Sequence, residues 1–331
     1  MSADAKKPWQ RRAPQPEWVR YVGTALAYGL ILPVTKLFGR RWSRFMSRTM
    51  TRFLSQFPKD YVPPAHDVLI CSYFKSGTNW TMQMAVQIAF RGRAEFAHIH
   101  DLVAWPDMSP RAQYAVPLED DEPQRASPTG LRVIKTHLAL GPVQYSPQGR
   151  YVCVVRDPKD VFVSSYHFTR SMTMGPLMPP VADWLDAYLS PDTALGSWAE
   201  HLASYWRVRD RTNVLFLTYE SMRGDLPGTV DKIAAHMGVA LTAEERAAVI
   251  ERSTFAHMKE IGRKFDAPGA PWASSAQGAM MRRGERGASS ELISAEQQWR
   301  IDDYWRAELT RIGCDFPYDD AFATAPRTAA A

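Results

Sequence analysis

Four short apolar runs constrain the fold of this chain more than any other feature of its sequence. Each run is rich in Val, Ile, Leu and Tyr, and none alternates polar with apolar residues as a strand with one solvated face does. Such runs form strands that are buried on both faces, which is typical of a parallel sheet. They are DVLICSY (67–73), LRVIKTH (131–137), YVCVVR (151–156) and NVLFLTY (213–219).

Helical patterns separate the four runs. Asp157 and Pro158 supply a capping side chain and a first-turn proline for one helix, and Pro227 and Gly238 mark the start and the end of another. The predicted helices cover residues 78–90, 158–168, 197–211 and 227–237. Strands that alternate with helices predict an α/β fold of three layers, in which helices flank a central parallel sheet in a P-loop-like arrangement. Ligands bind beyond the carboxyl ends of the strands in such folds.

The basic residues are concentrated at the amino end. The chain has a net charge of +5, yet residues 1–59 alone carry +10 and the remainder carries −5. This distribution argues against a nucleic-acid-binding face that extends over the chain. We therefore divide the chain into a basic arm (1–59), one domain (60–318) and a tail (319–331) that is expected to be disordered. Within the domain, residues 91–130 predict loop with short helices.

The arm contains two apolar segments. Residues 21–35 have no charge but are shorter than the roughly 20 residues of a spanning helix, and no small-residue cleavage site follows them. Residues 37–57 predict a helix with arginines on one face and aromatic residues on another. Two interpretations stay open: residues 21–57 lie on an anionic membrane surface, or the helix packs on the domain.

The cysteine content bears on location. Three cysteines are too few for a disulfide framework, which indicates a reducing compartment. We therefore expect the chain in the cytoplasm, and the inner face of a membrane is the surface that the arm would contact as a peripheral element.

The stretch SYFKSGTNWTM (72–82) follows the first predicted strand and begins the first predicted helix. Backbone N–H groups at a helix start point toward an anion, and Gly77 lets the backbone approach that anion closely. Lys75 adds a positive charge, and the polar side chains beside it add hydrogen-bond donors. In a nucleotide-triphosphate P-loop the lysine follows the last glycine, whereas here Lys75 precedes Gly77. The stretch therefore predicts a phosphate site that differs from a Walker A loop.

Two further motifs follow strand ends. In VVRDPKDVFVSSYHF (154–168), Arg156 offers the planar fork of donors that suits phosphate, and Ser164 lies about two turns into the next helix. In IKTHLAL, His137 ends a strand, where an imidazole can serve as a general base, and Lys135 points to the same side. Each motif alone also fits an ordinary helix start or a structural histidine.

Six motifs taken together resemble a known family, the cytosolic-type sulfotransferases, over roughly residues 60–315. The motifs, in the order in which the family carries them, are FKSGTNW, KTHL, VVRDPKDVFVSSYHF, LTYESM, STFAHMKE and MRRGERG. The resemblance implies transfer of a sulfuryl group from 3′-phosphoadenosine 5′-phosphosulfate (PAPS) to an alcohol or phenol, with no metal ion. The basic arm points to a small, lipophilic acceptor.

The resemblance also implies a role for each motif residue. Lys75 stabilises the leaving phosphate oxygen, His137 is the catalytic base, and Lys135 is an electrostatic partner of the sulfuryl group. The residues implied to hold the donor are Lys75, Ser76, Gly77, Thr78 and Asn79 at the 5′-phosphosulfate, Trp80, Tyr219 and Phe255 at the adenine ring, Arg156, Ser164, Arg282, Arg283 and Gly284 at the 3′-phosphate, and Ser253 as a further contact.

The sequence departs from the family pattern and leaves alternatives open. Asn79 stands where Thr is usual, and Ala-Ser-Ser follows Gly287 where the family has Asp-Trp-Lys, so the loop at the 3′-phosphate has its own way of closing. A P-loop nucleotide kinase or phosphotransferase and a non-catalytic, membrane-associated protein on the same fold are the alternatives. The run HIHD at 98–101 either coordinates a metal ion or lines the acceptor pocket, and we predict no metal site. The oligomeric state stays open.

Overall fold

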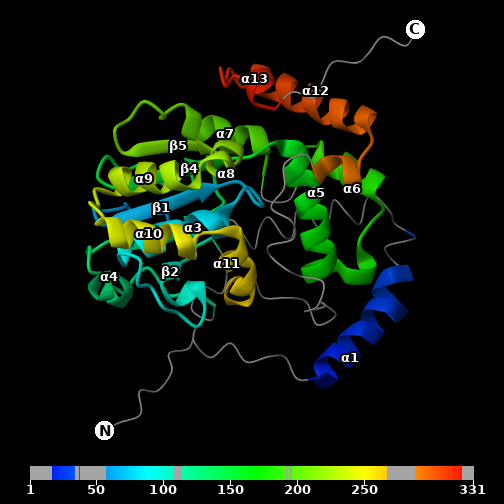
Figure 1. Ribbon diagram of the computed structural model, residues 1–331. Coiled ribbons are helices and arrows are strands. Elements are labelled where there is room, and N and C mark those ends of the chain that lie inside the picture. The colour runs from blue at the N-terminus through cyan, green and yellow to red at the C-terminus, as the bar shows by residue number, and fades with distance from the viewer. Residues whose placement is uncertain are drawn as a thin grey trace.

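The computed structural model describes residues 17–33, 37, 57–107, 114–190, 193, 196–266 and 288–322. Within this described part, five parallel strands form one sheet in the order β2-β3-β1-β4-β5 (Figure 1). The strands are β1 (Asp67–Ser72), β2 (Val103–Ala104), β3 (Arg132–Thr136), β4 (Arg150–Val155) and β5 (Val214–Thr218). The predicted α/β fold with a central parallel sheet is confirmed. Strand β2 was not predicted, because its two residues lie in an irregular stretch that was interpreted as loop with short helices.

The central strand β1 shows why its sequence lacks polar alternation. Val68 and Ile70 face one layer and pack in the same apolar cluster as helix α3 (Thr78–Ala89). Leu69 and Cys71 face the opposite layer, in a second apolar cluster. Because both faces are covered, all six residues of β1 are buried.

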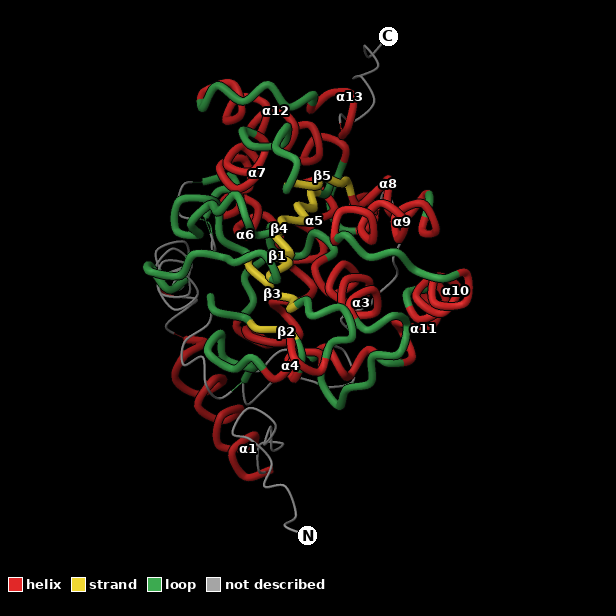
Figure 2. The backbone as a smooth tube through the Cα atoms, turned by 90° about the vertical axis from the view of Figure 1, so that its left-hand side faces the viewer, coloured by secondary structure: helices red, strands yellow, loops and turns green. Residues whose placement is uncertain are grey.

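Helices cover the sheet as the alternating pattern predicts. Helix α9 (Leu226–Met237) packs beside α3 on one face, and α10 (Ala243–Arg252) contacts both. On the other side of the sheet α7 (Trp198–Trp206) lies with α12 (Ala295–Arg311), which also contacts α5 (Pro158–Thr169) (Figure 2). Shorter helices complete the described chain: α4 (Glu122–Ala126), α6 (Val181–Tyr188), α8 (Tyr219–Gly224), α11 (Phe255–Glu260) and α13 (Tyr318–Phe322). Single turns of other helix types lie at Ile99–Asp101, Arg170–Met174, Gly175–Leu177, Gly262–Phe265 and Ala288–Glu291.

The helix ends follow the capping signals in the sequence. The Asp157 side chain accepts a hydrogen bond from the Lys159 N–H at the start of α5. Gly238 ends α9 with a φ of 72°, which a residue with a side chain rarely adopts. Helix α7 stops at Trp206, earlier than predicted, and the segment up to residue 213 forms turns before β5.

The two ends of the chain differ from the sequence-based expectation. Helix α1 (Glu17–Leu26) continues as a π-helical turn (Ala27–Ile31), whereas the helix predicted at 37–57 lies almost wholly outside the described residues. None of the helices in the described part has the length and apolar character needed to cross a bilayer. The predicted disordered tail begins too early, because α13 continues to Phe322, whose side chain is buried in the apolar cluster around α12.

Candidate active site

The predicted site residues meet at the carboxyl edge of the sheet. Lys75 follows β1, His137 follows β3, Arg156 follows β4 and Tyr219 follows β5. These strands are neighbours in the order β3-β1-β4-β5, so residues far apart in the sequence come together at one edge. Their individual roles stay predictions, and the geometry below states what each is able to do.

The turn from β1 to α3 has an unusual backbone conformation. Lys75 has a φ of 66° and Gly77 a φ of 100°, both in the left-handed region. A Cβ atom on Gly77 would lie 2.7 Å from the ring of Tyr219, so the close approach of the two segments requires glycine there. The Ser72 and Thr78 hydroxyls are 2.6 Å apart and tie the end of the strand to the first residue of the helix.

The Lys75 side chain is half-buried, and its ammonium group lies beside aromatic rings. Its Nζ atom is 4.3 Å from the centre of the Phe168 ring and 5.9 Å from that of Phe74. Burial of the ammonium group and, after it, the nearby Arg156 charge together lower the pKa of Lys75 to about 7. An anion bound at this turn would favour the charged form of Lys75.

Arg156 bridges the turn and the adjoining helix. Its Nη1 donates to the Lys75 carbonyl oxygen at 3.2 Å, and its Nη2 lies 3.5 Å from Asp160 Oδ2. The guanidinium carbon lies 4.4 Å from the centre of the Tyr219 ring. Ser164, implied to share the 3′-phosphate with Arg156, lies on α5 and is half-buried.

Among the described residues, the buried carboxylate oxygens Asp160 Oδ1 and Glu220 Oε2 lack a partner at this edge, and so do three buried hydrogen-bond donors. The three donors are the hydroxyl oxygens of Ser76 and Ser253 and the Nε atom of Arg156. A buried donor without a partner is costly, and a ligand that accepts hydrogen bonds removes that cost. Because two of these atoms belong to the residues implied to hold phosphate, the unpaired donors fit an anionic donor such as PAPS.

The side chains implied to hold adenine are placed unevenly. The Trp80 indole N–H donates to the Ser253 carbonyl oxygen at 2.7 Å, and its ring meets that of Tyr219 edge-on at 5.8 Å. Phe255 begins α11, two residues after Ser253, and is 43% exposed. A base that entered beside Trp80 would find Phe255 free to cover it. Asn79 lies in the first turn of α3, whereas Arg282, Arg283 and Gly284 lie outside the described residues.

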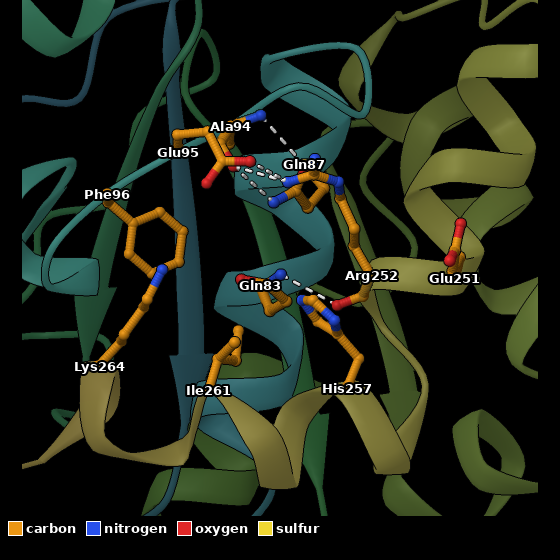
Figure 3. Close-up of a pocket in the computed structure, with 10 residues that line it drawn as sticks. All are labelled: Gln83, Gln87, Ala94, Glu95, Phe96, Glu251, Arg252, His257, Ile261 and Lys264. Carbon is orange, nitrogen blue, oxygen red and sulfur yellow. Dashed lines mark hydrogen bonds and ion pairs between the residues drawn. The ribbon is translucent and has the colours of Figure 1, made fainter.

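A polar pocket of about 260 Å³ adjoins this region on the surface of α3 (Figure 3). Gln83 Nε2 donates to the Arg252 carbonyl oxygen at 3.0 Å, and Gln87 exchanges hydrogen bonds with the backbone of Ala94. Arg252 in turn forms an ion pair with Glu95 at 2.7 Å. These bonds hold α10 against α3 and so fix the distance between Trp80 and Ser253.

The His137 ring is held by one of its two nitrogen atoms. Its Nδ1 lies 2.8 Å from the Ser72 carbonyl oxygen, which can only accept, so the proton sits on Nδ1 and Nε2 carries the lone pair. Burial and, after it, the Lys135 charge hold the pKa of His137 well below its ordinary value, so the ring is neutral at pH 7. Phe74 and Trp105 stand edge-on to the ring, at 5.8 and 5.9 Å. The ring can therefore take a proton from an acceptor in an apolar setting.

Lys135 occupies the same side of β3 as His137, as the two-residue period predicts. Its Nζ lies 3.6 Å from the centre of the Trp105 ring. Burial lowers the pKa of Lys135 to about 7, the Asp107 carboxylate opposes that shift, and Lys75 adds to it. Sequence reasoning missed Trp105 and Asp107, because both lie in the irregular stretch, where no periodicity or motif singles them out.

The HIHD run forms a cap and an aromatic stack. The Nδ1 of His98 accepts from the His100 N–H, and the Asp101 carboxylate accepts from the His98 N–H. The His98 ring stacks on His100, which stacks on Trp105 at 5.3 Å. In the described part of the chain, no group of three or more His, Cys, Asp or Glu side chains is arranged to hold a metal ion. Trp105, the last ring of this stack, also contacts His137. That the HIHD run lines the acceptor pocket stays a prediction.

The sequence of this chain is similar to those of known proteins. A family model described as the sulfotransferase domain matches residues 65–313. Sulfotransferase 1C2 of Oryctolagus cuniculus is 29% identical over 264 residues, which cover 76% of this chain and 85% of the relative. Amine sulfotransferase of the same species is 27% identical over 269 residues, which cover 76% of this chain and 84% of the relative.

Solved structures show the same fold. Mouse sulfotransferase SULT7A1, complexed with PAP, has a TM-score of 0.59 at 23% identity, over 80% of this chain and 90% of its own. Retinol dehydratase, in a complex with retinol and PAP, has a TM-score of 0.59 at 21% identity, over 83% of this chain and 88% of its own.

Proposed function

This chain belongs to the sulfotransferase domain family, and we propose that it transfers a sulfuryl group from PAPS to a hydroxyl group of a small, lipophilic acceptor. The observation that carries the proposal is one edge of the sheet where two cationic side chains, three unpaired buried donors and a neutral imidazole meet. Lys75 and Arg156 supply the cations, and His137 supplies the imidazole.

The residues divide the reaction between them. The acceptor hydroxyl gives its proton to Nε2 of His137 while its oxygen forms a bond to sulfur. The bond between sulfur and the bridging oxygen of the donor breaks, and the electron pair stays on the 5′-phosphate of adenosine 3′,5′-bisphosphate (PAP). Lys75 stabilises that charge, and Lys135 faces the sulfuryl oxygens. Each step uses side chains of this chain, and we propose that it needs no metal ion.

The walls beside His137 indicate the acceptor. Phe74 and Trp105 enclose the imidazole, and Phe168 meets Phe74 edge-on at 5.2 Å. A hydroxyl carried on an apolar skeleton would bury its surface against these rings, at about 25 cal/mol for each Å². Among the proteins compared, retinol dehydratase binds retinol and androsterone, which are alcohols of this character.

Nucleotide selectivity tests the proposal against the kinase alternative. A ligand present at about 100 times its Kd stabilises the folded state by about 2.7 kcal/mol, which raises the melting temperature of a domain of this size by about 5 °C. We expect this shift with PAP and not with ATP and Mg²⁺. A shift with ATP and Mg²⁺ alone would instead support a phosphotransferase, although the order Lys75 before Gly77 argues against a Walker A loop.

We also propose that the arm, residues 1–59, contacts an anionic membrane surface from the cytoplasmic side through residues 21–57 and the adjoining first turn of α1. Trp18, Tyr21, Val22 and Leu26 recur at three- and four-residue steps on α1 and are 50–74% exposed. Figure 1 shows α1 standing apart from the sheet. An exposed aromatic stripe within a segment of net charge +10 matches a bilayer with acidic headgroups.

Co-sedimentation with vesicles tests the membrane contact. The full chain should pellet with vesicles that contain about a quarter phosphatidylserine and stay in solution with pure phosphatidylcholine. The double change Trp18→Ser and Leu26→Ser should release it, whereas Val62→Ser, at an exposed apolar residue outside the arm, should not. Equal soluble fractions for all three proteins would rule out the membrane contact.

A further inference from the structure

A buried carboxylate beside the proposed site has no role in the reaction as described above. Asp107 is 1% exposed and lies three residues after β2. A carboxylate is buried at a high cost unless its oxygens accept hydrogen bonds and a positive charge is near. The groups that surround Asp107 therefore indicate its role.

Both oxygens of Asp107 bind the end of the strand that carries the imidazole. Oδ1 accepts from the Thr136 hydroxyl at 2.9 Å, and Oδ2 accepts from the His137 N–H at 2.6 Å. The Thr136 hydroxyl oxygen also accepts from the Leu138 N–H at 3.1 Å. The Asp107 carboxylate thus holds the backbone of His137, and the Ser72 carbonyl oxygen holds the His137 ring.

The Asp107 carboxylate also acts electrostatically on the buried Lys135. The Asp107 charge raises the pKa of Lys135, which lies on β3, against the effect of burial. Burial raises the pKa of Asp107 itself to about 6, although the His137 N–H, the Thr136 hydroxyl and Lys135 lower it. The other titratable groups that face this cluster are Lys75 in the turn after β1 and His201 and Tyr205 on α7.

We propose that Asp107 is a positioning residue for sulfuryl transfer: it holds the His137 backbone and keeps the Lys135 ammonium group charged beside the sulfuryl group. This inference rests on the proposed function. The same carboxylate thus accepts a hydrogen bond from the backbone of the proposed base and interacts electrostatically with Lys135.

The variant Asp107→Asn separates the two parts of the role. An asparagine keeps the shape but has one acceptor oxygen in place of two, so the Thr136 hydroxyl and the His137 N–H no longer each have a carboxylate oxygen, and the negative charge is lost. We expect kcat with PAPS and 2-naphthol to fall about 10- to 100-fold, because a misplaced catalytic group costs on this scale. The high-pH limb of the kcat profile should move down by about 1 pH unit, because Lys135 loses the charge that favours its protonated form.

Two further variants keep the test decisive. Thr136→Val removes one hydrogen bond to Asp107 but keeps its charge, so kcat should fall at least about 3-fold with the high-pH limb in place. Asp67→Asn alters another buried carboxylate, which pairs with Arg132 at the opposite end of β3. That control should lose stability and keep both kcat for the folded fraction and the position of the limb.

The outcomes separate this inference from the proposed function. If the unaltered protein transfers sulfate and Asp107→Asn keeps kcat within about 2-fold and the limb unmoved, the inference is wrong and the function stands. If Asp107→Asn does not fold, an unchanged kcat in Thr136→Val overturns the inference instead. If the unaltered protein does not use PAPS at all, the proposed function fails first, and PAP binding by thermal shift reports that independently.

Discussion

The replacement His137→Asn gives the sharpest prediction about the proposed chemistry. The His137 ring is almost wholly buried, and its Nδ1–H donates to the Ser72 carbonyl oxygen at 2.8 Å. The side-chain amide of asparagine places an N–H near the Nδ1 position, so the bond to Ser72 can persist. The replacement removes Nε2, the atom to which we propose that the acceptor proton is transferred.

The expected size of the loss follows from that single atom. General-base catalysis contributes about 10²–10⁴-fold, which corresponds to about 3–5 kcal/mol of barrier. Removing ring atoms that meet Phe74 and Trp105 edge-on should cost stability of about 1–3 kcal/mol through lost packing. PAP affinity should stay within about 3-fold, because no bond from His137 reaches Lys75 or Arg156.

The assay measures kcat with ³⁵S-labelled PAPS and 2-naphthol, together with the Kd for PAP and the melting temperature. His201→Asn is the matched control, since His201 is a buried histidine on α7 that contacts Tyr73 and Tyr205 and takes no part in the proposed reaction. Because burial keeps the pKa of His137 well below its ordinary value, protonation of this ring should not limit activity at pH 6.5. A kcat for His137→Asn within about 10-fold of the unaltered protein would refute the base assignment.

Three further predictions concern the donor turn and the fold. Gly77→Ala should weaken PAP binding at least about 10-fold and lower the free energy of unfolding by about 1–3 kcal/mol, because alanine would have to adopt a φ of 100° and its Cβ would meet the Tyr219 ring. Calorimetry measures the affinity and urea unfolding measures the stability. An affinity equal to that of the unaltered protein would contradict the close approach of Gly77 and Tyr219. The pKa of Lys75 is lowered to about 7 in the free protein, and a bound anion would raise it. The Kd for PAP should therefore increase by up to about 10-fold for each pH unit from pH 7 to 9. A Kd that stays constant over this range would contradict the link between PAP binding and protonation of Lys75. Lys159→Met leaves the Asp302 carboxylate buried without the ammonium group that lies 2.6 Å away. The free energy of unfolding in urea should therefore fall by about 3–5 kcal/mol. A fall below about 1 kcal/mol would contradict the importance of the buried ion pair.

The parts of the fold that the sequence predicts are those with a local signal. Strand β1 is apolar on both faces because helices cover both, and the same four runs that lack polar alternation become β1, β3, β4 and β5. Helix starts follow capping side chains such as Asp157, and helix ends follow residues such as Gly238, which adopts the left-handed conformation. Strand β2 has two residues and gives no such signal, since its pairing with β3 comes from tertiary packing.

The candidate site divides in the same way. Lys75, Arg156 and His137 follow strand ends that a local pattern reveals, so their convergence at one edge follows from the topology. Trp105 and Asp107 reach the site from an irregular loop, and only the folded chain brings Asp107 within 2.6 Å of the His137 N–H. Residues whose role depends on a contact between distant segments leave no periodic trace in the sequence.

Transfer from labelled PAPS tests the central claim most directly. The purified full chain, incubated with ³⁵S-labelled PAPS and a panel of phenols and long-chain alcohols, should release PAP and labelled sulfate ester in equal amounts, without added metal ion. A parallel incubation with γ-³²P-labelled ATP and Mg²⁺ should label none of the acceptors. Phosphorylated acceptor in the second incubation, with no sulfate ester in the first, would contradict the account.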